Sequence, residues 1–563
     1  MDAACHSTTV TDHREPTASP RRRHACLWKQ ATSIGFWWRS RRQVAQQLGV
    51  PDSSFRDCLR QHQRRCQESR FPRSFVEFCQ SPEGLDFLHR QLVALHLVFG
   101  QANDCGLRNL CRFLELSGLD EFLPASYGAQ QAFAAGLETA LCESGQEEEQ
   151  RLLVAMPHRE ISLVEDETFH PQICLVAIEP VSDFLLLEQY APKRDAETWN
   201  RCLDERLAGW SVTVCQVTSD EASALIAHTQ QHLGAHHSPD LFHVQQDTVR
   251  AVSFSLAGQT RSAYEALAKA QRQVVQRQAE LAACQEQCPE SAAAVERQSD
   301  EAVAGADQAR QRLATCQTRQ QQASQARRGL SREYHPIDLQ SGRPLAAEEV
   351  GRRLCGHFDQ LDEIAQAAAL PAHSRDKLAK ARRVLAALQS TIAFFWTQVA
   401  ARLASWQLSE AVTIWLREEL IPGLYLELAA AKLPTANERR ALQARATEIL
   451  ARARSPDGVW GTLSETQRAE LENKARGCAT LFQRSSSCVE GHNGQLSLRH
   501  HGLHRLSVRK LAALRVLHNY WTTRRDGTTA AERFFGTRPQ PLFPWLLNRL
   551  GLPAEPRHHR HAA

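Results

Sequence analysis

A block of strand-like sequence, residues 159–252, interrupts a chain whose other regions carry helical spacing. Apolar and β-branched runs occur in REISLVEDETF, ICLVAIEPVSDFLLLEQYA and VTVCQVTSD, and the second run has turn residues at its centre. Between the second and third runs, DAETWNRCLDERLAGW has helical spacing through Trp199, Leu203 and Leu207. We expect a helix after the third run and a further strand in DLFHVQQDTVRAV. The order β, β, β, α, β, α, β predicts an α/β domain.

Two aspartates follow strands of this block. Asp166 closes ISLVED, and Asp220 closes VTVCQVTSD. Residues at strand ends converge on one rim of an open α/β sheet. If the two strands are neighbours, these carboxylates can therefore share a divalent cation. Mg²⁺ prefers a few carboxylates, with water and phosphate oxygens at its other positions. A third acid on a later helix would complete the site, and our candidate is Glu490 in SSSCVEGHNG.

Glu490 also has a purely structural interpretation. Ser487 and Glu490 are spaced as in a capping box, in which the serine caps a helix and the glutamate reaches back to its amide. However, Gly491, Asn493 and Gly494 follow at once and are poor helix formers. A cap needs no such neighbours, whereas close approach of a DNA backbone would explain them.

The two aspartates have alternatives as well. Asp220 can cap the helix that begins next to it. Asp166 lies between two other acids that can equally be solvated. Weaker candidates for a metal position come later in the block. These four competing acids are Glu165, Glu167, Asp240 and Asp247.

Charge is distributed unevenly along the 563 residues. The net charge of +4 combines +8 over residues 1–73, −13 over 74–483 and +9 over 484–563. Basic ends around an acidic middle indicate a polyanionic partner, most simply nucleic acid. Ordinary solvated arginines are the alternative.

The basic N-terminal region contains a helix-turn-helix pattern. In SRRQVAQQLGVPDSSFRDCLRQHQRR, Gly49 falls where two helices would meet, and the small Ala45 allows them to cross closely. An ordinary helical hairpin is the alternative. The residues that we expect to contact DNA are Arg41, Arg42, Ser53, Ser54, Arg56 and Arg60.

Helical spacing dominates the rest of the chain. Residues 74–150 end in ESGQEEEQ, which has the composition of a polar linker, and 258–480 read as almost wholly helical. Within the latter, Pro289 separates two heptad patterns, which predicts two antiparallel helices. Low-complexity disorder is the alternative. The two sets of expected seam residues are Tyr264, Leu267, Val274 and Leu281, and Val295, Ala302, Ala309 and Cys316.

The order of the expected strands, helix and acidic motifs along the chain resembles that of a known protein family. The strand, strand, strand, helix, strand order, with acids in VEDETF and VTSD and a later CVEGHNG, is similar to the ribonuclease H-like core of DDE-type bacterial insertion-sequence transposases. SPDLFHVQQD resembles the strand that follows the second acid, and HNYWTTRRDGTTAAERFFG resembles transposase and integrase tails. The likeness covers about residues 160–250 and 480–537. The tyrosine–arginine–glutamate–lysine signature of one large family does not follow Glu490.

The resemblance implies a mechanism and partners. Asp166, Asp220 and Glu490 would be the catalytic, metal-binding triad, with Mg²⁺ as the cation and Mn²⁺ as an alternative. Beside these ligands, we expect His243 to be a packed or ligand-supporting histidine rather than a ligand, and His492 and Asn493 are candidates for the same supporting position. The implied activity is hydrolysis and strand transfer at the ends of an insertion element. Implied partners are double-stranded DNA and further copies of the chain, without a membrane, in a bacterial cytoplasm at the nucleoid.

These expectations divide the chain into a ribonuclease H-like mixed-sheet core, an all-α N-terminal region and a large all-α insertion. Two other functions fit the sequence: a transposase-derived DNA-binding protein without catalysis, and a helical scaffold. The expected segments are a basic leader (1–25), the helix-turn-helix (26–73), a helical region (74–150), the first part of the core (151–257), the helical insertion (258–480), the final part of the core (481–540) and a tail (541–563).

Overall fold

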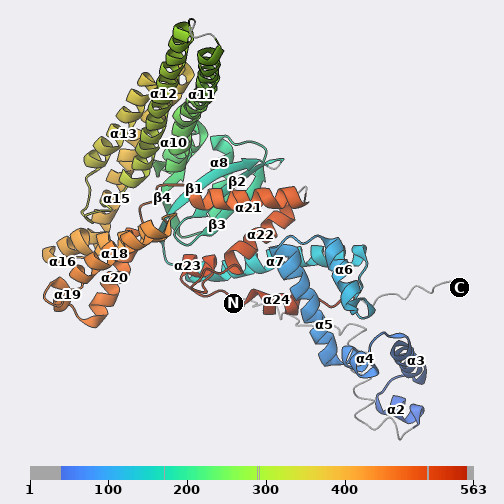
Figure 1. Ribbon diagram of the computed structural model, residues 1–563. Helices are drawn as coiled ribbons and strands as arrows, with labels where there is room; N and C mark the ends of the chain where they lie inside the picture. Colours follow the sequence, from blue (N-terminus) through green and yellow to red (C-terminus); the bar gives the residue numbers. More distant parts are fainter. Residues whose placement is uncertain (1–39, 170, 288–289, 291, 504–505, 554–563) are drawn as a thin grey trace. The chain divides into compact units, whose positions relative to one another are not determined.

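A computed structural model of the protein describes residues 40–169, 171–287, 290, 292–503 and 506–553 (Figure 1). The expected leader, the first part of the helix-turn-helix region (26–39), Pro289 and the last ten residues of the tail (554–563) lie outside these residues. The chain forms two units. Unit 1 comprises Met1–Met156 and Leu496–Ala563, and unit 2 comprises Pro157–Gln495. The expected final part of the core, 481–540, is thus divided between the two units.

Unit 1 is helical throughout its described part. Its helices are α2 (Arg41–Gln47), α3 (Asp52–Glu68), α4 (Arg73–Gln80), α5 (Pro82–Ala94), the π-helical η2 (Leu95–Ala102), α6 (Leu107–Ser117), the short η3 (Leu119–Glu121), α7 (Tyr127–Ala155), α22 (Val508–Tyr520), α23 (Ala530–Phe535) and α24 (Leu542–Arg549). The expected linker ESGQEEEQ is wrong, because it lies inside α7. Glu148 within it is buried and pairs with Arg151 at 2.5 Å, and Glu143 pairs with Arg549 of α24 at 2.8 Å.

Helices α2 and α3 form the expected helical pair. Gly49 in the connecting turn has φ +65, a conformation that glycine adopts without strain. Val44, Ala45 and Phe55 are buried against one another, and Ser40 caps α2 with a capping box. These contacts confirm the expected pair of helices, with the small Ala45 buried between them.

Unit 2 is built on one mixed five-stranded sheet in the order β3-β2-β1-β4-β5. Strand β1 pairs antiparallel with β2 and parallel with β4, β2 pairs antiparallel with β3, and β4 pairs parallel with β5. The strands are β1 (Arg159–Phe169), β2 (Ile173–Glu179), β3 (Phe184–Ala191), β4 (Val212–Ser219) and β5 (His236–Pro239). Helix α8 (Ala196–Leu207) precedes β4, and α9 (Ser223–Ala227) with η4 (His228–His232) precedes β5.

The first four strands and the helix between β3 and β4 confirm the sequence expectations, but the fifth strand does not. DLFHVQQDTVRAV forms helix α10 (Leu241–Thr248) and the turn η5 (Val249–Ser253), because its apolar residues recur at helical spacing. The four residues before it, HHSP, form β5 instead. Asp166 is also not at the end of its strand, since β1 continues to Phe169.

The two faces of the sheet have different coverings. Glu165 and Glu167 of β1 lie on the face covered by α8 and η4, where Glu167 accepts a hydrogen bond from the indole of Trp199. Asp166 lies on the other face, because side chains alternate along a strand. Helix α21 (Ser487–Leu503) crosses that second face over β1–β3 (Figure 1).

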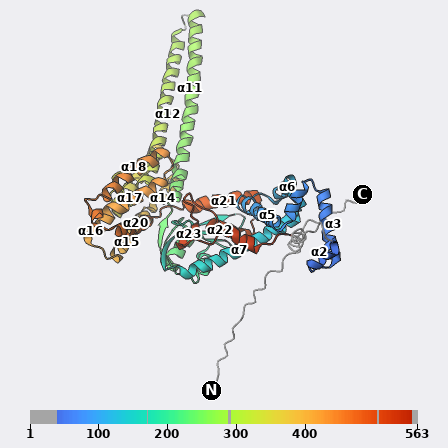
Figure 2. The same cartoon turned by 90° about the horizontal axis from the view of Figure 1, so that it is seen from below.

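The expected helical insertion follows the sheet. Its helices are α11 (Phe254–Gln287), α12 (Ala292–Glu333), α13 (Ala347–Ala367), α14 (Ala372–Arg383), α15 (Leu385–Ser405), α16 (Glu410–Trp415), η7 (Leu416–Leu420), α17 (Ile421–Ala431), α18 (Ala436–Ala453), α19 (Val459–Thr462) and α20 (Glu465–Ala479). Figure 2 shows α11 and α12 side by side as a long hairpin, as the heptads predict. Tyr264 is wrong as a seam residue: it is 64% exposed, and the neighbouring Ala263 is buried instead.

One stretch, Ala372–Ser405, is long and apolar enough to cross a membrane by length and composition. It comprises α14 and α15. Helix α15 buries Leu388, Phe395 and Val399 in the hydrophobic core of the insertion, where Phe395 contacts Phe482. These contacts are those of a core helix in unit 2.

Candidate active site

The carboxyl ends of the three parallel strands place three aspartates at one level. The last paired residues of β1 and β4 are Val164 and Thr218, and Asp166 and Asp220 each lie two residues further on. Ser219 of β4 pairs with Pro239 of β5, so Asp220 and Asp240 follow in equal register. Strands β1 and β4 are neighbours, which is the condition under which Asp166 and Asp220 could share a cation.

Helix α21 brings residues from the far end of unit 2 to this row. Asn493 donates from Nδ2 to Oδ2 of Asp166 over 2.8 Å. One residue earlier, His492 Nε2 lies 2.6 Å from Oε1 of Glu188 on β3. Glu188 pairs with Val176, which pairs with Asp166, so the two acids lie on the same face of the sheet. Asn493 and His492 therefore fasten α21 across three strands.

Electrostatic coupling connects the predicted triad. The pKa of Asp166 is raised from its ordinary 3.8 to about 7. Burial is the main cause, and the negative charges of Glu490 and Asp220 raise it as well, while the backbone amide of Glu167 opposes the shift. Burial also raises the pKa of Glu490, the nearby Asp240 adds to the increase, and His243 opposes it. Mutual repulsion of this kind is typical of carboxylates that share a site.

The tightest group of ligand atoms near the row is a different set. Oxygens of Asp240 and Glu490 and a ring nitrogen of His243 all lie within 4.8 Å of one another. His243 Nδ1 is 3.3 Å from Oδ2 of Asp240, and His243 Nε2 is 3.7 Å from Oε1 of Glu490. Asp166 and Asp220 do not belong to this group. From the sequence, Asp240 is one of the weaker candidates and His243 lies beside the site, and the pairing of His243 with Glu490 was not predicted.

Asp240 connects the start of α10 to the residue before α21, and we call this contact the Asp240–Ser486 joint. Its buried carboxylate accepts hydrogen bonds from the backbone N–H of Phe242 and Ser486, at 2.9 and 3.0 Å, and from the Ser486 hydroxyl at 2.6 Å. Ser486 immediately precedes α21. Asp240 therefore caps α10 and at the same time fixes the start of the helix that carries Glu490.

The capping interpretation fails for Glu490 and holds for Asp220. In the part of the chain that the structure describes, the Glu490 carboxylate pairs with His243 and accepts no hydrogen bond from Ser487, so it forms no capping box. Asp220 does accept a hydrogen bond from the Ala222 N–H through Oδ1, at 3.0 Å, just before α9. One oxygen of Asp220 thus has a structural role, as the alternative proposed.

The glycines after Glu490 do not break the helix. Helix α21 continues through Gly491 and Gly494 to Leu503. A side chain added at either glycine would meet no atom within 4 Å. These glycines therefore leave open space along one side of α21 rather than allowing close packing inside unit 2.

The side-chain types of the predicted triad are those that bind a hard divalent cation. Asp166, Asp220 and Glu490 offer carboxylate oxygens, which are the ligands that Mg²⁺ and Mn²⁺ prefer. Within the described residues, the buried Oδ1 of Asn493 accepts no hydrogen bond, whereas Nδ2 of the same amide donates to Asp166. A metal-bound water would satisfy such an atom.

The predicted DNA-contacting residues divide into two kinds. Ser53, Ser54 and Arg60 are exposed on α3. Arg41 instead pairs with Asp52 through two hydrogen bonds, at 3.0 and 3.2 Å. Arg56 is half-buried. Arg42 on α2 is exposed, as Ser53, Ser54 and Arg60 are on α3.

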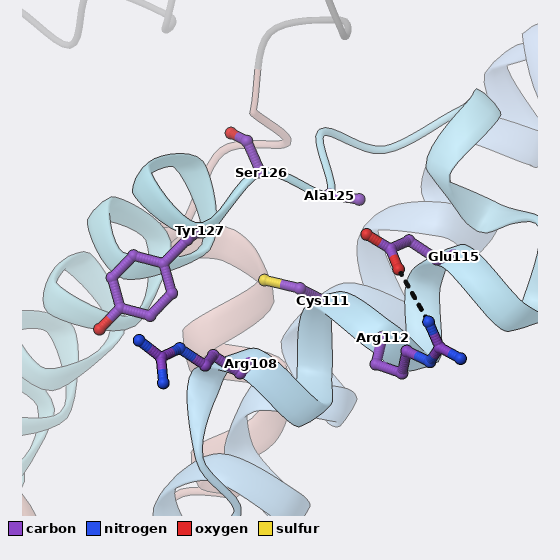
Figure 3. Close-up of a pocket in the computed structure, with 7 residues that line it drawn as sticks. All are labelled: Arg108, Cys111, Arg112, Glu115, Ala125, Ser126 and Tyr127. Carbon is purple, nitrogen blue, oxygen red and sulfur yellow. Dashed lines mark ion pairs between the residues drawn. The ribbon is translucent and has the colours of Figure 1, made fainter.

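Unit 1 contains a pocket of about 450 Å³ that the sequence did not indicate (Figure 3). It lies between α6 and the start of α7, with Arg108, Arg112 and Tyr127 on its walls. Arg112 pairs with Glu115 at 4.0 Å. Glu115 is the only acid among the lining residues in the described part of the chain, so the lining suits an anion better than a cation.

Part of the chain is similar to a known protein family. A family of unknown function, DUF6399, matches residues 416–562. No curated protein and no solved structure matches the chain. The matched segment includes Glu490 and Asn493 and excludes Asp166, Asp220 and Asp240.

Proposed function

We propose that the chain is a DNA transposase that uses divalent cations to cut and join phosphodiester bonds at the ends of an insertion element. The observation that carries the proposal is the position of Asp166 and Asp220, in equal register on neighbouring parallel strands, with Glu490 on the helix that crosses the same face. The raised pKa of Asp166 supports it, because the charges of Glu490 and Asp220 contribute to that shift.

The sheet supports a ribonuclease H-like core. Three antiparallel-paired strands come first, then a helix, then β4 beside β1, which is the element order in the resemblance. The insertion between β5 and α21 then accounts for the long separation between Asp220 and Glu490. The basic helix-turn-helix in unit 1 supports double-stranded DNA as the substrate.

In this proposal, some side chains of the site bind the cation and others hold those ligands in position. Asp166, Asp220 and Glu490 would hold Mg²⁺ or Mn²⁺, which supplies activation of the attacking oxygen and stabilisation of the leaving oxygen. Asn493 stabilises the ionised form of Asp166 by donating to Oδ2. The Asp240–Ser486 joint sets the start of α21 and hence the position of Glu490. The reaction needs no nucleophilic side chain, since water or a DNA 3′-hydroxyl attacks.

The test uses labelled DNA that spans both flanks of the chain's own gene. Full-length protein with Mg²⁺ or Mn²⁺ should cut this DNA at fixed positions, and Asp220→Asn should bind it equally well without cutting. Asp204→Asn is the matched control, because Asp204 is an exposed aspartate that pairs with His232 on η4. Equal binding with no cutting by the wild-type protein or any variant would overturn the proposal and favour a DNA-binding protein without catalysis.

A further inference from the structure

His243 lies in a position that the predicted triad leaves without a role. Its ring is about one-third exposed and stands between a buried carboxylate and Glu490. Oδ2 of Asp240 lies 3.3 Å from Nδ1 and Oε1 of Glu490 lies 3.7 Å from Nε2. Each ring nitrogen therefore faces a different acid.

The two acids beside the His243 ring differ in the hydrogen bonds that they already accept. Asp240 is buried and already accepts three hydrogen bonds from Phe242 and Ser486, so its oxygens are committed to the joint. In the neutral tautomer that carries its proton on Nδ1, His243 donates this N–H to Asp240. The lone pair of Nε2 then faces Glu490, whose carboxylate accepts no hydrogen bond from the described residues. Two lone-pair donors facing each other across 3.7 Å are stabilised by a cation between them.

This arrangement matches a recurring feature of metal centres. A histidine that binds a metal through one nitrogen usually donates its other N–H to a carboxylate, which fixes the tautomer and the ring orientation. Asp240 supplies that carboxylate here. Both His243 and Glu490 are about one-third exposed, so solvent and a phosphate oxygen can reach the space between them.

We propose that His243 Nε2 is a metal ligand that shares one divalent cation with Glu490, while Asp240 orients the ring. The inference rests on the proposed function, because it takes Glu490 as a metal ligand. A nitrogen ligand favours Mn²⁺, Co²⁺ or Zn²⁺ over Mg²⁺, which prefers oxygen. This cation position is therefore selective for Mn²⁺ over Mg²⁺.

Binding of Mn²⁺ alone to the full-length protein tests the inference without any reaction. Electron paramagnetic resonance measures free Mn²⁺, and electron spin echo modulation detects a directly bound nitrogen. We expect wild-type protein to show nitrogen coupling. His243→Ala should lose that coupling and weaken Mn²⁺ binding about ten-fold or more. Its Mg²⁺ affinity, measured by competition, should change less than about three-fold, because Mg²⁺ depends on the oxygen ligands.

A matched control and a fold check accompany this variant. His232→Ala removes another histidine, 33% exposed and 2.9 Å from the acid Asp204, and should leave both affinities and the nitrogen coupling unchanged. Circular dichroism melting establishes that each variant is folded, and His243→Gln repeats the test with a larger side chain.

The outcomes separate this inference from the proposed function. In one outcome, Asp220→Asn and Glu490→Gln weaken the binding of both Mn²⁺ and Mg²⁺, while His243→Ala behaves like His232→Ala. His243 is then not a ligand, and the triad stands. If the His243 effect appears but the labelled DNA is never cut, the mixed nitrogen and oxygen site stands and the transposase activity does not. If neither Glu490→Gln nor His243→Ala alters Mn²⁺ binding, the site inferred here is overturned.

Discussion

Asn493 on α21 donates a hydrogen bond of 2.8 Å to Asp166 on β1, across 327 residues of sequence. The contact closes unit 2 on itself, because the whole helical insertion lies between the two residues. It also places Glu490, one turn earlier on α21, on the face of the sheet that carries Asp166. The position of the third predicted acid therefore depends on how α21 is anchored.

Replacing Asp166 by asparagine should stabilise the protein in the absence of divalent cations. The pKa of Asp166 is about 7 in the folded protein and 3.8 ordinarily, so the unfolded chain loses this proton first as pH rises. Stability from this group is therefore highest below pH 4, falls between pH 4 and 7, and stays low above. The difference corresponds to at most about 4 kcal/mol.

Thermal unfolding with a chelator measures this effect. Asp166→Asn should melt above wild type at pH 8 and close to it at pH 4. The exposed Asp204→Asn should follow wild type at both. A variant that melts below wild type at pH 8 would show that the Asp166 charge is stabilised in the folded protein.

Removing the Asn493 side chain should shift the pH dependence of DNA cutting toward higher pH. The Nδ2 donor stabilises the ionised form of Asp166, so Asn493→Ala should raise the pKa of Asp166 further. A hydrogen bond to a charged group contributes about 1.5–3 kcal/mol, which corresponds to about one to two pH units. Cutting rates from pH 6 to 9 check this.

Gln495→Ala, an exposed change on the same helix, should leave that profile in place. A loss in Asn493→Ala by the same factor at every pH would mean that Asn493 only positions α21.

Strands β1 and β4 could be predicted from the sequence because apolar, β-branched runs are a local signal, although Asp166 lies inside β1 rather than at its end. Each aspartate follows an apolar, β-branched run, and parallel pairing of β1 with β4 brings both to one level. Strand β5 gave no such signal, since His236–Pro239 is short and polar. Its pairing is supported by long-range contacts instead: His236 stacks on Phe394 of α15, with ring centroids 4.4 Å apart.

The role of Asp240 could not be predicted for the same reason. Its partner Ser486 is 246 residues away, and the sequence near either residue says nothing about the other. The misplaced strand at DLFHVQQDTVRAV also hid the fact that Asp240 begins a helix. Glu490 was proposed from its neighbours Gly491, Asn493 and Gly494 and from the family resemblance, because α21 carries no apolar periodicity that would orient it.

Breaking the joint should destabilise unit 2. Ser486→Ala removes the hydroxyl that donates to the buried Asp240 carboxylate at 2.6 Å, which should cost about 1.5–3 kcal/mol. Urea unfolding followed by circular dichroism measures this as a lower midpoint. The adjacent Ser485→Ala should unfold like wild type, since Ser485 donates only to Ser487. Equal midpoints for the two variants would show that the joint does not contribute.

Substitution of Arg60 should weaken DNA binding through charge alone. Arg60 is exposed on α3, so Arg60→Ala should lower affinity for the labelled DNA and reduce the salt dependence of binding by about one phosphate contact. Arg64→Ala is the matched control, because Arg64 pairs with Glu68 at 2.8 Å on the same helix. Fluorescence anisotropy over a range of salt concentrations measures both. If both variants bind like wild type at every salt concentration, α3 is not the DNA-binding helix, and the basic charge of unit 1 acts elsewhere.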